Sequence, residues 1–249
     1  MKSHFLERLP YLWTPPVKDL VLVSGSDASH FESLLQFLAS ARAHEGATKR
    51  MVYDLGLSHD KRRRLKIEYP DVELRAFDYS RYPAHVDIKD NAGQYAWKPV
   101  IICDVLEEFK RPVCWMDAGN VVTEPLLWLR KFLGGNGFYS PISEGTIADW
   151  THPGTLKALG AGRDLLGRRN RSGACVAVAY DGNGPVSRMV RKWKACALAR
   201  DCIAPPGSDR TNHRQDQAVL SVLSYQCGVA QRSPVLKHGF LTHRDLEGR

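Results

Sequence analysis

A single carboxylate, Asp117, stands where a short apolar run gives way to the small residues Ala118 and Gly119. The run, residues 113–116, has the length and composition of a buried strand, which would place Asp117 at its carboxyl end. In open α/β sheets that edge is where ligands bind. A carboxylate there suits Mg²⁺ or Mn²⁺ bound to a diphosphate, because both ions prefer hard oxygen ligands. A buried acid without a partner is unfavourable, so we expect Asp117 to have a functional role.

Lys98 is the second residue that points to phosphate chemistry. It lies between Trp97 and Pro99, at the expected start of a helix over residues 97–109. From that position its ammonium group would reach the phosphates that Asp117 binds through a metal. A solvated lysine is the alternative.

Polar turns follow the first two expected strands. Amides and side chains of the first turn would face a nucleotide base or ribose. Ser and Asp are also natural caps of the following helix, so a capping role stays open. In the second turn, Tyr53 and Asp54 also follow a strand. Asp54 would either form a hydrogen bond with a ribose or stabilise the turn through its own backbone contacts. The residues of the first turn are Ser24, Gly25, Ser26 and Asp27.

Two further positions belong to the second half of the chain. Asp216 begins an expected helix over residues 215–226, where the helix dipole alone would stabilise a carboxylate. The family resemblance described below implies a second role for Asp216 as an acid on the acceptor side, either as a general base or as the group that orients an acceptor hydroxyl. Gly173 would permit close approach to the backbone, which the resemblance described below assigns to a donor sugar, although small residues also simply fit a central strand.

The elements that must position these residues alternate between strand and helix. This order predicts a parallel sheet with crossover helices, in one domain whose second half decorates the first. In the first part of the chain, strands are expected at 19–27, 49–58 and 72–77, and helices at 28–43 and 59–69. Later strands are expected at 113–116, 138–140 and 171–180, and later helices at 97–109, 185–199 and 215–226.

Composition limits the function classes. The chain has 249 residues, 43% of them hydrophobic, and a net charge of +8. This basic balance would attract nucleic acid, an anionic membrane or a phosphorylated substrate. The basic run at residues 61–64 is most simply the solvated face of a helix, because no aromatic residues or nucleic-acid motif accompany it. We therefore expect no nucleic-acid partner, and peripheral contact with a membrane stays open.

The cysteines and the N-terminus indicate a cytoplasmic protein. The first 16 residues lack the continuous apolar stretch of a signal peptide, and no apolar run is long enough to span a membrane. An even number of cysteines would permit disulfides in a secreted protein, but without an export signal we expect free buried thiols. Their spacings do not fit a zinc site. The six cysteines are Cys103, Cys114, Cys175, Cys196, Cys202 and Cys227.

The order of elements resembles that of the GT-A glycosyltransferases. In detail the chain resembles a poorly characterised glycosyltransferase-like group once described as a domain of unknown function. The motifs that carry this resemblance lie at residues 52–58, 75–78, 82–83, 97–99, 115–119 and 216–217. The resemblance implies a nucleotide-sugar transferase domain over residues 18–240. Residues 18–123 would bind the donor nucleotide, and residues 124–240 would shape the acceptor site.

The metal motif of that family is Asp-x-Asp, and here Gly119 stands where the second acid is expected. Asn120 offers an oxygen but lies one residue later. In related enzymes a late histidine completes the metal site, and the resemblance makes His238 its counterpart. Asp117 and His238 would then hold Mn²⁺ or Mg²⁺, with diphosphate oxygens and waters as the remaining ligands.

The resemblance thus implies a hexosyltransferase-like enzyme that transfers a sugar from a nucleoside-diphosphate donor to a hydroxyl of a glycan or lipid-linked acceptor. Lys98 and the metal would neutralise the departing diphosphate. Three alternatives stay open. One is a catalytically inactive protein of the same fold that binds nucleotides or glycans, which Gly119 would explain. The others are a sugar-phosphate nucleotidyltransferase, for which the turn at residues 24–27 is a poor phosphate loop, and a basic nucleic-acid-binding module.

Overall fold

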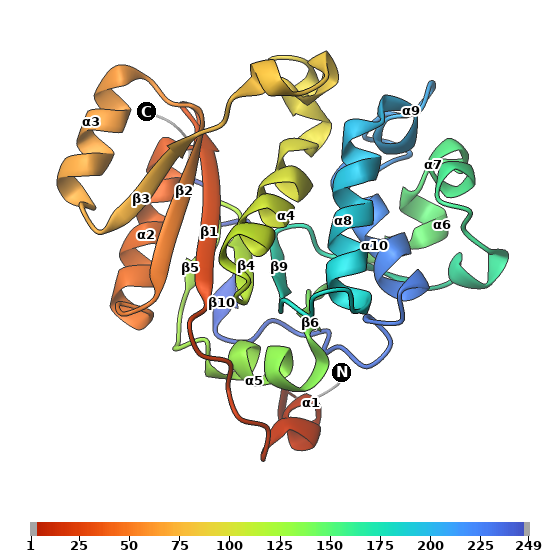
Figure 1. Ribbon diagram of the computed structural model, residues 1–249, viewed down its shortest axis with the longest axis horizontal. Helices are drawn as coiled ribbons and strands as arrows, with labels where there is room; N and C mark the ends of the chain where they lie inside the picture. The colour runs from red at the N-terminus through yellow and green to blue at the C-terminus, as the bar shows by residue number, and fades with distance from the viewer. Residues whose placement is uncertain (1–3, 247–249) are drawn as a thin grey trace.

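The computed structural model describes residues 4–246 and has a six-stranded sheet at its centre (Figure 1). The strand order is β3-β2-β1-β4-β9-β6, and the first four strands run parallel. β9 pairs antiparallel with both β4 and β6. The strands are β1 (Val21–Asp27), β2 (Lys49–Gly56), β3 (Val72–Ala76), β4 (Val113–Met116), β6 (Phe138–Tyr139) and β9 (Cys175–Val178). The predicted mostly parallel α/β architecture in one domain is confirmed.

Helices cover both faces of the sheet because its strands are apolar on both sides. In β1, Val21 and Val23 pack in one core cluster while Leu22 packs in the other, as alternation along a strand requires. The first cluster includes residues of α4 (Trp97–Phe109), α8 (Pro185–Leu198) and α10 (Gln215–Gln226). The second includes residues of α2 (Phe31–His44), α3 (His59–Glu68) and α5 (Leu127–Asn136). Both faces are therefore closed to solvent.

The remaining elements are short and surround this body. Two strand pairs lie outside the main sheet: β5 (Val121–Val122) with β10 (Phe240–Leu241), and β7 (Ile142–Thr146) with β8 (Arg169–Arg171). The short helices are α1 (His4–Arg8), α6 (Ile147–Trp150), α7 (Pro153–Ala158) and α9 (Arg200–Ile203). Because β10 pairs with β5, the C-terminal segment returns to the sheet next to the Asp117 turn.

The strand order creates a crevice beside β1. From β1 the chain proceeds outward through β2 to β3, and then α4 leads back to β4 on the other side of β1. Neighbouring connections thus leave β1 and β4 in opposite directions, which opens a space outside their carboxyl ends. The turn after β1 and the turn after β4, which holds Asp117, both face this space.

The elements expected from the sequence agree closely with those observed. The helices expected at 97–109 and 215–226 have the same bounds in the structure. The strand expected at 171–180 is shorter, because β9 spans only Cys175–Val178 and the preceding Arg169–Arg171 pairs with β7 instead. Both halves of the predicted domain contribute strands to one sheet, and their division into donor and acceptor parts stays a prediction.

The expectation that all cysteines are free is wrong for two of them. Cys196 at the end of α8 and Cys202 in α9 form a disulfide, with Cα atoms 5.2 Å apart. A sharp turn at Ala199 brings the two helices together, which spacing alone does not reveal. The other four cysteines are free thiols.

The basic run at residues 61–64 lies on α3 and is engaged with neighbouring groups. Arg62 pairs with Asp54, and Arg64 pairs with Glu32 and Glu68. This agrees with the interpretation as a solvated helix face. Among residues 4–246, no helix combines the length and the hydropathy needed to cross a membrane.

Candidate active site

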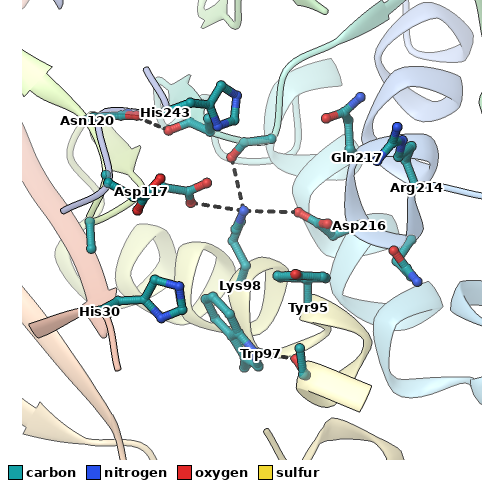
Figure 2. A pocket seen from close by; sticks show the side chains of 18 of the residues that line it. His30, Tyr95, Trp97, Lys98, Asp117, Asn120, Arg214, Asp216, Gln217 and His243 are labelled. Carbon is teal, nitrogen blue, oxygen red and sulfur yellow. Dashed lines mark hydrogen bonds and ion pairs between the residues drawn. The ribbon is translucent and has the colours of Figure 1, made fainter. Parts of the chain in front are cut away.

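A cavity of about 640 Å³ opens at the carboxyl ends of β1 and β4. The sheet supplies one wall, the start of α4 and the start of α10 supply the second, and the C-terminal segment supplies the third (Figure 2). Its polar lining includes Asp27, His30, Lys98, Asp117, Asn120, Glu144, Arg210, Arg214, Gln215, Asp216, Gln217, His243 and Asp245.

Lys98 is the centre of the site. Its ammonium nitrogen lies 3.0 Å from Asp117 Oδ1 and 3.3 Å from Asp216 Oδ2, and it donates a hydrogen bond of 3.2 Å to the Gly173 carbonyl. Figure 2 shows these three interactions converging on Nζ from different parts of the chain. The side chain of Lys98 is only 5% exposed. Three oxygens thus face its three N–H groups, and a direct phosphate contact would require one of them to be displaced.

Aromatic rings close the remaining space around the ammonium. The ring centroids of Trp97 and Trp115 lie 5.8 Å from Nζ and that of Tyr95 lies 5.9 Å away. Each ring face attracts the cation, and together they exclude water from it. The low-polarity wall strengthens the attraction between Lys98 and its two carboxylates.

These surroundings shift the ionisation of both buried partners. Burial alone would lower the pKa of Lys98, but Asp117 and Asp216 together hold that pKa above its usual value. Burial raises the pKa of the Asp216 carboxyl, and Lys98 opposes the rise. Asp216 therefore accepts a proton more readily than an exposed aspartate does, which suits an acid–base role.

The turn after β4 holds Asp117 in a fixed direction. The indole N–H of Trp115 donates a 2.6 Å hydrogen bond to Asp117 Oδ1. The Ala174 carbonyl accepts hydrogen bonds from the Asp117 amide, at 3.0 Å, and from the Asn120 side chain, at 2.7 Å. Asp117 is more open than its neighbours, with 36% of its side chain exposed, so it faces the cavity while one oxygen stays on Lys98.

Gly173 leaves no room for a larger residue. A Cβ atom at this position would lie 3.0 Å from Asp216 Oδ2 and 3.6 Å from Lys98 Nζ. The missing side chain thus allows the backbone to approach the charged group and to accept its hydrogen bond. The structure places Gly173 beside Lys98 and Asp216, two of the residues predicted to belong to the site.

Residues 24–27, predicted as a turn after the first strand, are instead the last four residues of β1, and their roles differ. Gly25, Ser26 and Asp27 line the cavity, whereas Ser24 is fully buried in the strand. Asp27 accepts hydrogen bonds from the Ser29 amide and from the His30 amide and ring. The His30 bond holds the pKa of Asp27 well below its usual range, and the same bond raises the pKa of His30. Asp27 thus holds the turn that leads into α2, but it does not cap the helix, because the N-cap residue is His30 and no side chain among the described residues makes a capping hydrogen bond there.

The second predicted turn lies away from the cavity. Asp54 is buried and accepts hydrogen bonds from the Gly56 and Leu57 amides while it pairs with Arg62. Tyr53 packs in the core with 8% of its surface exposed. Neither residue is among those that line the cavity. For Asp54 the structure thus supplies the turn role rather than a ribose contact.

His238, predicted as a metal ligand beside Asp117, is held elsewhere. Its side chain is fully buried, its Nε2 lies 3.1 Å from Glu7, and its ring packs edge-on against Phe132. This histidine serves the packing of α1 and α5, because Glu7 takes its polar edge. His243, five residues later, is the late histidine that lines the cavity.

The cation site implied by the family resemblance lacks one acid of the Asp-x-Asp motif, because Gly119 stands at that position. Within residues 4–246, no three Asp, Glu, His or Cys side chains are grouped closely enough to hold a metal ion by themselves. Asp117 nevertheless faces the cavity, and Asp245 reaches the space above Gly119. One or two carboxylates with substrate phosphates and waters are an ordinary environment for Mg²⁺, so the residues present fit a hydrated ion on a diphosphate.

Sequence reasoning missed the acceptor-side wall and the backbone before α4. Arg214 stacks on Trp150, 4.0 Å from the ring centroid, and Arg210 donates a 2.6 Å hydrogen bond to Tyr95. Residues 91–95 all have positive φ values, between 47° and 61°. Tyr95 lies three residues before Lys98, but no pattern in the sequence assigns it to the site. The rest depend on loop conformations that have no periodic pattern.

Comparisons with known proteins agree with this architecture. A family model described as "Protein of unknown function (DUF1647)" matches residues 14–103. A search of curated proteins found no significant match. Several solved structures, in contrast, are similar to this chain in fold. The galactosyltransferase LgtC, in complex with donor and acceptor sugar analogs, is 14% identical with a TM-score of 0.52, over 90% of this chain and 86% of its own.

Two other glycosyltransferases are similar in structure. Core-mannan synthase A from Aspergillus fumigatus, in a Mn/GDP form, is 7% identical with a TM-score of 0.56 over 83% of this chain and 69% of its own. The bifunctional WbbM, in an apo form, is 16% identical with a TM-score of 0.54 over 89% of this chain and 40% of its own. The chain has the GT-A fold. At these identities the likeness establishes the fold and leaves donor and acceptor to the chemistry of the site.

Proposed function

We propose that this protein is a glycosyltransferase that moves a sugar from a nucleoside-diphosphate donor to a hydroxyl acceptor. The observation that carries the proposal is the ion cluster formed by Lys98, Asp117 and Asp216 at the crevice between β1 and β4. It joins the donor side of a GT-A fold to the first turn of α10. A buried lysine that links two carboxylates across a cavity is more than packing requires, since such groups are costly to desolvate.

Each group has a definite task in this proposal. The carboxyl end of β1, residues 25–27, would receive the nucleotide, and Asp117 would face the diphosphate. Lys98 is a positioning residue, because it fixes the directions of Asp117 and Asp216. Asp216 is the group that would accept a proton from, or orient, the acceptor hydroxyl. Gly173 would allow the sugar to lie close to Asp216 and Gln217, which both line the cavity.

The chemistry needs positive charge at the leaving group. The cavity is lined by five carboxylates against three lysine or arginine side chains, so an added diphosphate would meet net negative charge. When bound, a divalent cation would neutralise the diphosphate as it leaves. The Mn/GDP form of core-mannan synthase A supports this expectation by analogy. Arg210 and Arg214, on the opposite wall, are the cations of this chain available to the phosphates or the acceptor.

A thermal-shift panel tests the donor site. UDP, GDP, CMP and ADP would each be added with Mn²⁺, Mg²⁺ or EDTA. A ligand present at about 100 times its dissociation constant stabilises the folded state by about 2.7 kcal/mol. We expect stabilisation by one nucleotide, strongest with a divalent cation, and its loss in Asp117→Asn. If no nucleotide stabilises the wild-type protein in any metal condition, the donor site is wrong.

The inactive binding protein is the second candidate, because Gly119 departs from the Asp-x-Asp pattern. It would bind the nucleotide and show no release of nucleotide from UDP- or GDP-sugars, with or without a hydroxyl acceptor. An enzyme would release nucleotide slowly by hydrolysis, and Asp216→Asn would reduce this turnover more than it reduces binding. The nature of the acceptor, glycan or lipid-linked, and peripheral membrane contact remain predictions.

A further inference from the structure

The space above Gly119 is occupied by the carboxylate of Asp245. A Cβ atom built on Gly119 would lie 2.3 Å from Asp245 Oδ1 and 2.5 Å from Oδ2. A side chain at position 119 would fit only if this carboxylate, the flexible end of Asp245, moved away. The position where the family pattern has its second acid thus lacks a side chain, and an acid from the C-terminal segment stands in the same place.

The backbone holds Asp245 there from both sides. β10 pairs with β5, which begins two residues after Gly119. The Arg244 amide donates a 2.7 Å hydrogen bond to the Gly119 carbonyl, and the Leu246 amide donates a 2.9 Å hydrogen bond to the Ser33 hydroxyl in α2. Since the residues before and after Asp245 are both anchored, its carboxylate has only short side-chain freedom. This segment is built around the Asp117 turn.

The carboxylate of Asp245 is available to a ligand. Within residues 4–246, no hydrogen bond or ion pair within 4.0 Å involves its oxygens. Asp245 and Asp117 line the same cavity. Asn120 lines it too, is fully buried, and has an Oδ1 atom that accepts no hydrogen bond from the described residues. Two carboxylates and an amide oxygen without a donor form an environment of hard oxygen ligands.

We propose that Asp245 replaces the missing second acid and forms, with Asp117, the site for the divalent cation that carries the donor diphosphate. This inference rests on the proposed function and makes it more specific. Gly119 is then a compensated change rather than the mark of an inactive protein, because the acid has moved from the turn to the C-terminal segment. Asn120 Oδ1 and the substrate phosphates would supply further oxygens, and waters the remainder.

Manganese binding tests the proposal without an activity assay. Mn²⁺ would be titrated into the full chain, alone and with UDP or GDP, while electron paramagnetic resonance follows the free ion. We expect Asp245→Asn to weaken Mn²⁺ binding at least about tenfold, because even loss of an outer-shell partner costs 10–100-fold. Glu124→Gln is the matched control, since this exposed acid lies outside the cavity and should leave binding unchanged.

Two variants at Gly119 sharpen the test. In Gly119→Ala the new methyl group would displace the flexible end of Asp245, so Mn²⁺ binding should weaken while the protein stays folded. In the double variant Gly119→Asp with Asp245→Gly the carboxylate is returned to the turn, and most of the lost affinity should return. A purely structural role for Asp245 would not produce this recovery.

The outcomes separate this inference from the proposed function. If Asp245→Asn and Gly119→Ala bind Mn²⁺ as tightly as the wild-type protein, Asp245 is not a ligand, whatever the nucleotide results. If the wild-type protein binds no Mn²⁺ under any of these conditions, the inference is likewise overturned. Failure of every nucleotide to bind, with Asp245-dependent Mn²⁺ binding intact, would instead refute the donor assignment and leave the cation site standing.

Discussion

At the scale of single residues, Lys98 stabilises two acids that would otherwise repel each other across the cavity. Removal of its charge in Lys98→Met should leave Asp117 and Asp216 facing each other without a cation. Loss of one partner from a buried ion group costs about 3–5 kcal/mol, and we expect an effect near the lower bound because Asp117 is partly exposed. Chemical denaturation would measure the free energy of unfolding.

The partner variant provides the control for Lys98. Asp216→Asn removes one of the two acids, so the double variant Lys98→Met with Asp216→Asn should be less destabilised than the sum of the single changes. Additive losses would show that Lys98 and Asp216 do not depend on each other energetically. Nucleotide binding should weaken both in Lys98→Met and in the double variant, because Asp117 loses the ion pair that fixes its direction.

His30 gives the site a pH-dependent component at the cavity mouth. Its hydrogen bond to Asp27 raises its pKa above 6.5, with further help from Asp245 and Asp117. A raised pKa stabilises the fold fully below the unfolded value, near 6.5, and this contribution disappears as the pH rises through the folded value. The side chain of His30 is 59% exposed and that of Asp27 is 28% exposed, so we expect this contribution to be less than about 1 kcal/mol.

The corresponding measurement compares unfolding free energies at pH 6 and pH 9. The wild-type protein should exceed His30→Gln in stability by more at pH 6 than at pH 9. An equal difference at the two pH values would mean that the imidazole is neutral throughout the range. Ser29→Ala keeps the imidazole and its bond to Asp27, so its stability should retain most of the wild-type dependence on pH.

At the scale of elements, the left-handed turn before α4 brings Tyr95 and Trp97 to the cavity. Ala92 has a φ of 55°, a conformation that costs a non-glycine residue about 1–2 kcal/mol. Glycine adopts this conformation without strain, so Ala92→Gly removes that cost. The greater conformational freedom of glycine in the unfolded chain offsets part of the gain, so we expect the variant to be more stable by about 1 kcal/mol or less. Thermal and denaturant unfolding would measure this change.

Two neighbouring substitutions act as controls for the turn. Ala96 has a φ of −64°, so Ala96→Gly should destabilise the protein. Gly93→Ala should destabilise it more strongly, because the new Cβ atom would lie 2.3 Å from the Val86 carbonyl oxygen. A loss of stability in Ala92→Gly would contradict the argument. If Ala92→Gly is more stable but binds nucleotide more weakly, the strained turn contributes to nucleotide binding.

The sequence predicts the elements better than it predicts their ends. Residues 97–109 and 215–226 have helical spacing and an obvious apolar face, and their bounds agree with α4 and α10. Lys98, Asp117 and Asp216 follow from these elements, because strand ends and helix starts at one sheet edge must converge. His243 and Asp245 were not predicted, since their position depends on a two-residue strand pairing that has no sequence pattern.

His238 illustrates the same limit. A histidine next to a glycine near the C-terminus matched the expected position of a metal ligand. Its actual position follows from Glu7 and Phe132, residues far away in the sequence, and from the packing of α1 and α5. Long-range packing selects which of several late histidines reaches the cavity, and single-sequence patterns contain no information on it.

At the scale of the whole molecule, the disulfide between Cys196 and Cys202 connects the face that carries α8 to the loop that leads towards Asp216. Both cysteines are mostly buried in the core cluster that also contains Trp193, whose indole donates a hydrogen bond to the Asp216 carbonyl. A crosslink between residues six apart stabilises the fold by about 2 kcal/mol in the chain-entropy account. The double variant Cys196→Ser with Cys202→Ser should lose about this much stability.

Thiol titration checks the pairing directly. The denatured but unreduced protein should expose four thiols, and the reduced protein six. Six thiols without reductant would contradict the disulfide, and Cys227→Ser should lower both counts by one. Disulfides persist in oxidising compartments and are rare in the cytosol. The expectation of free thiols relied on the expected cytoplasmic location, so four thiols in protein purified from its native source under alkylating conditions would argue against that location. Nucleotide binding before and after reduction would then show whether the crosslink also maintains the position of Asp216.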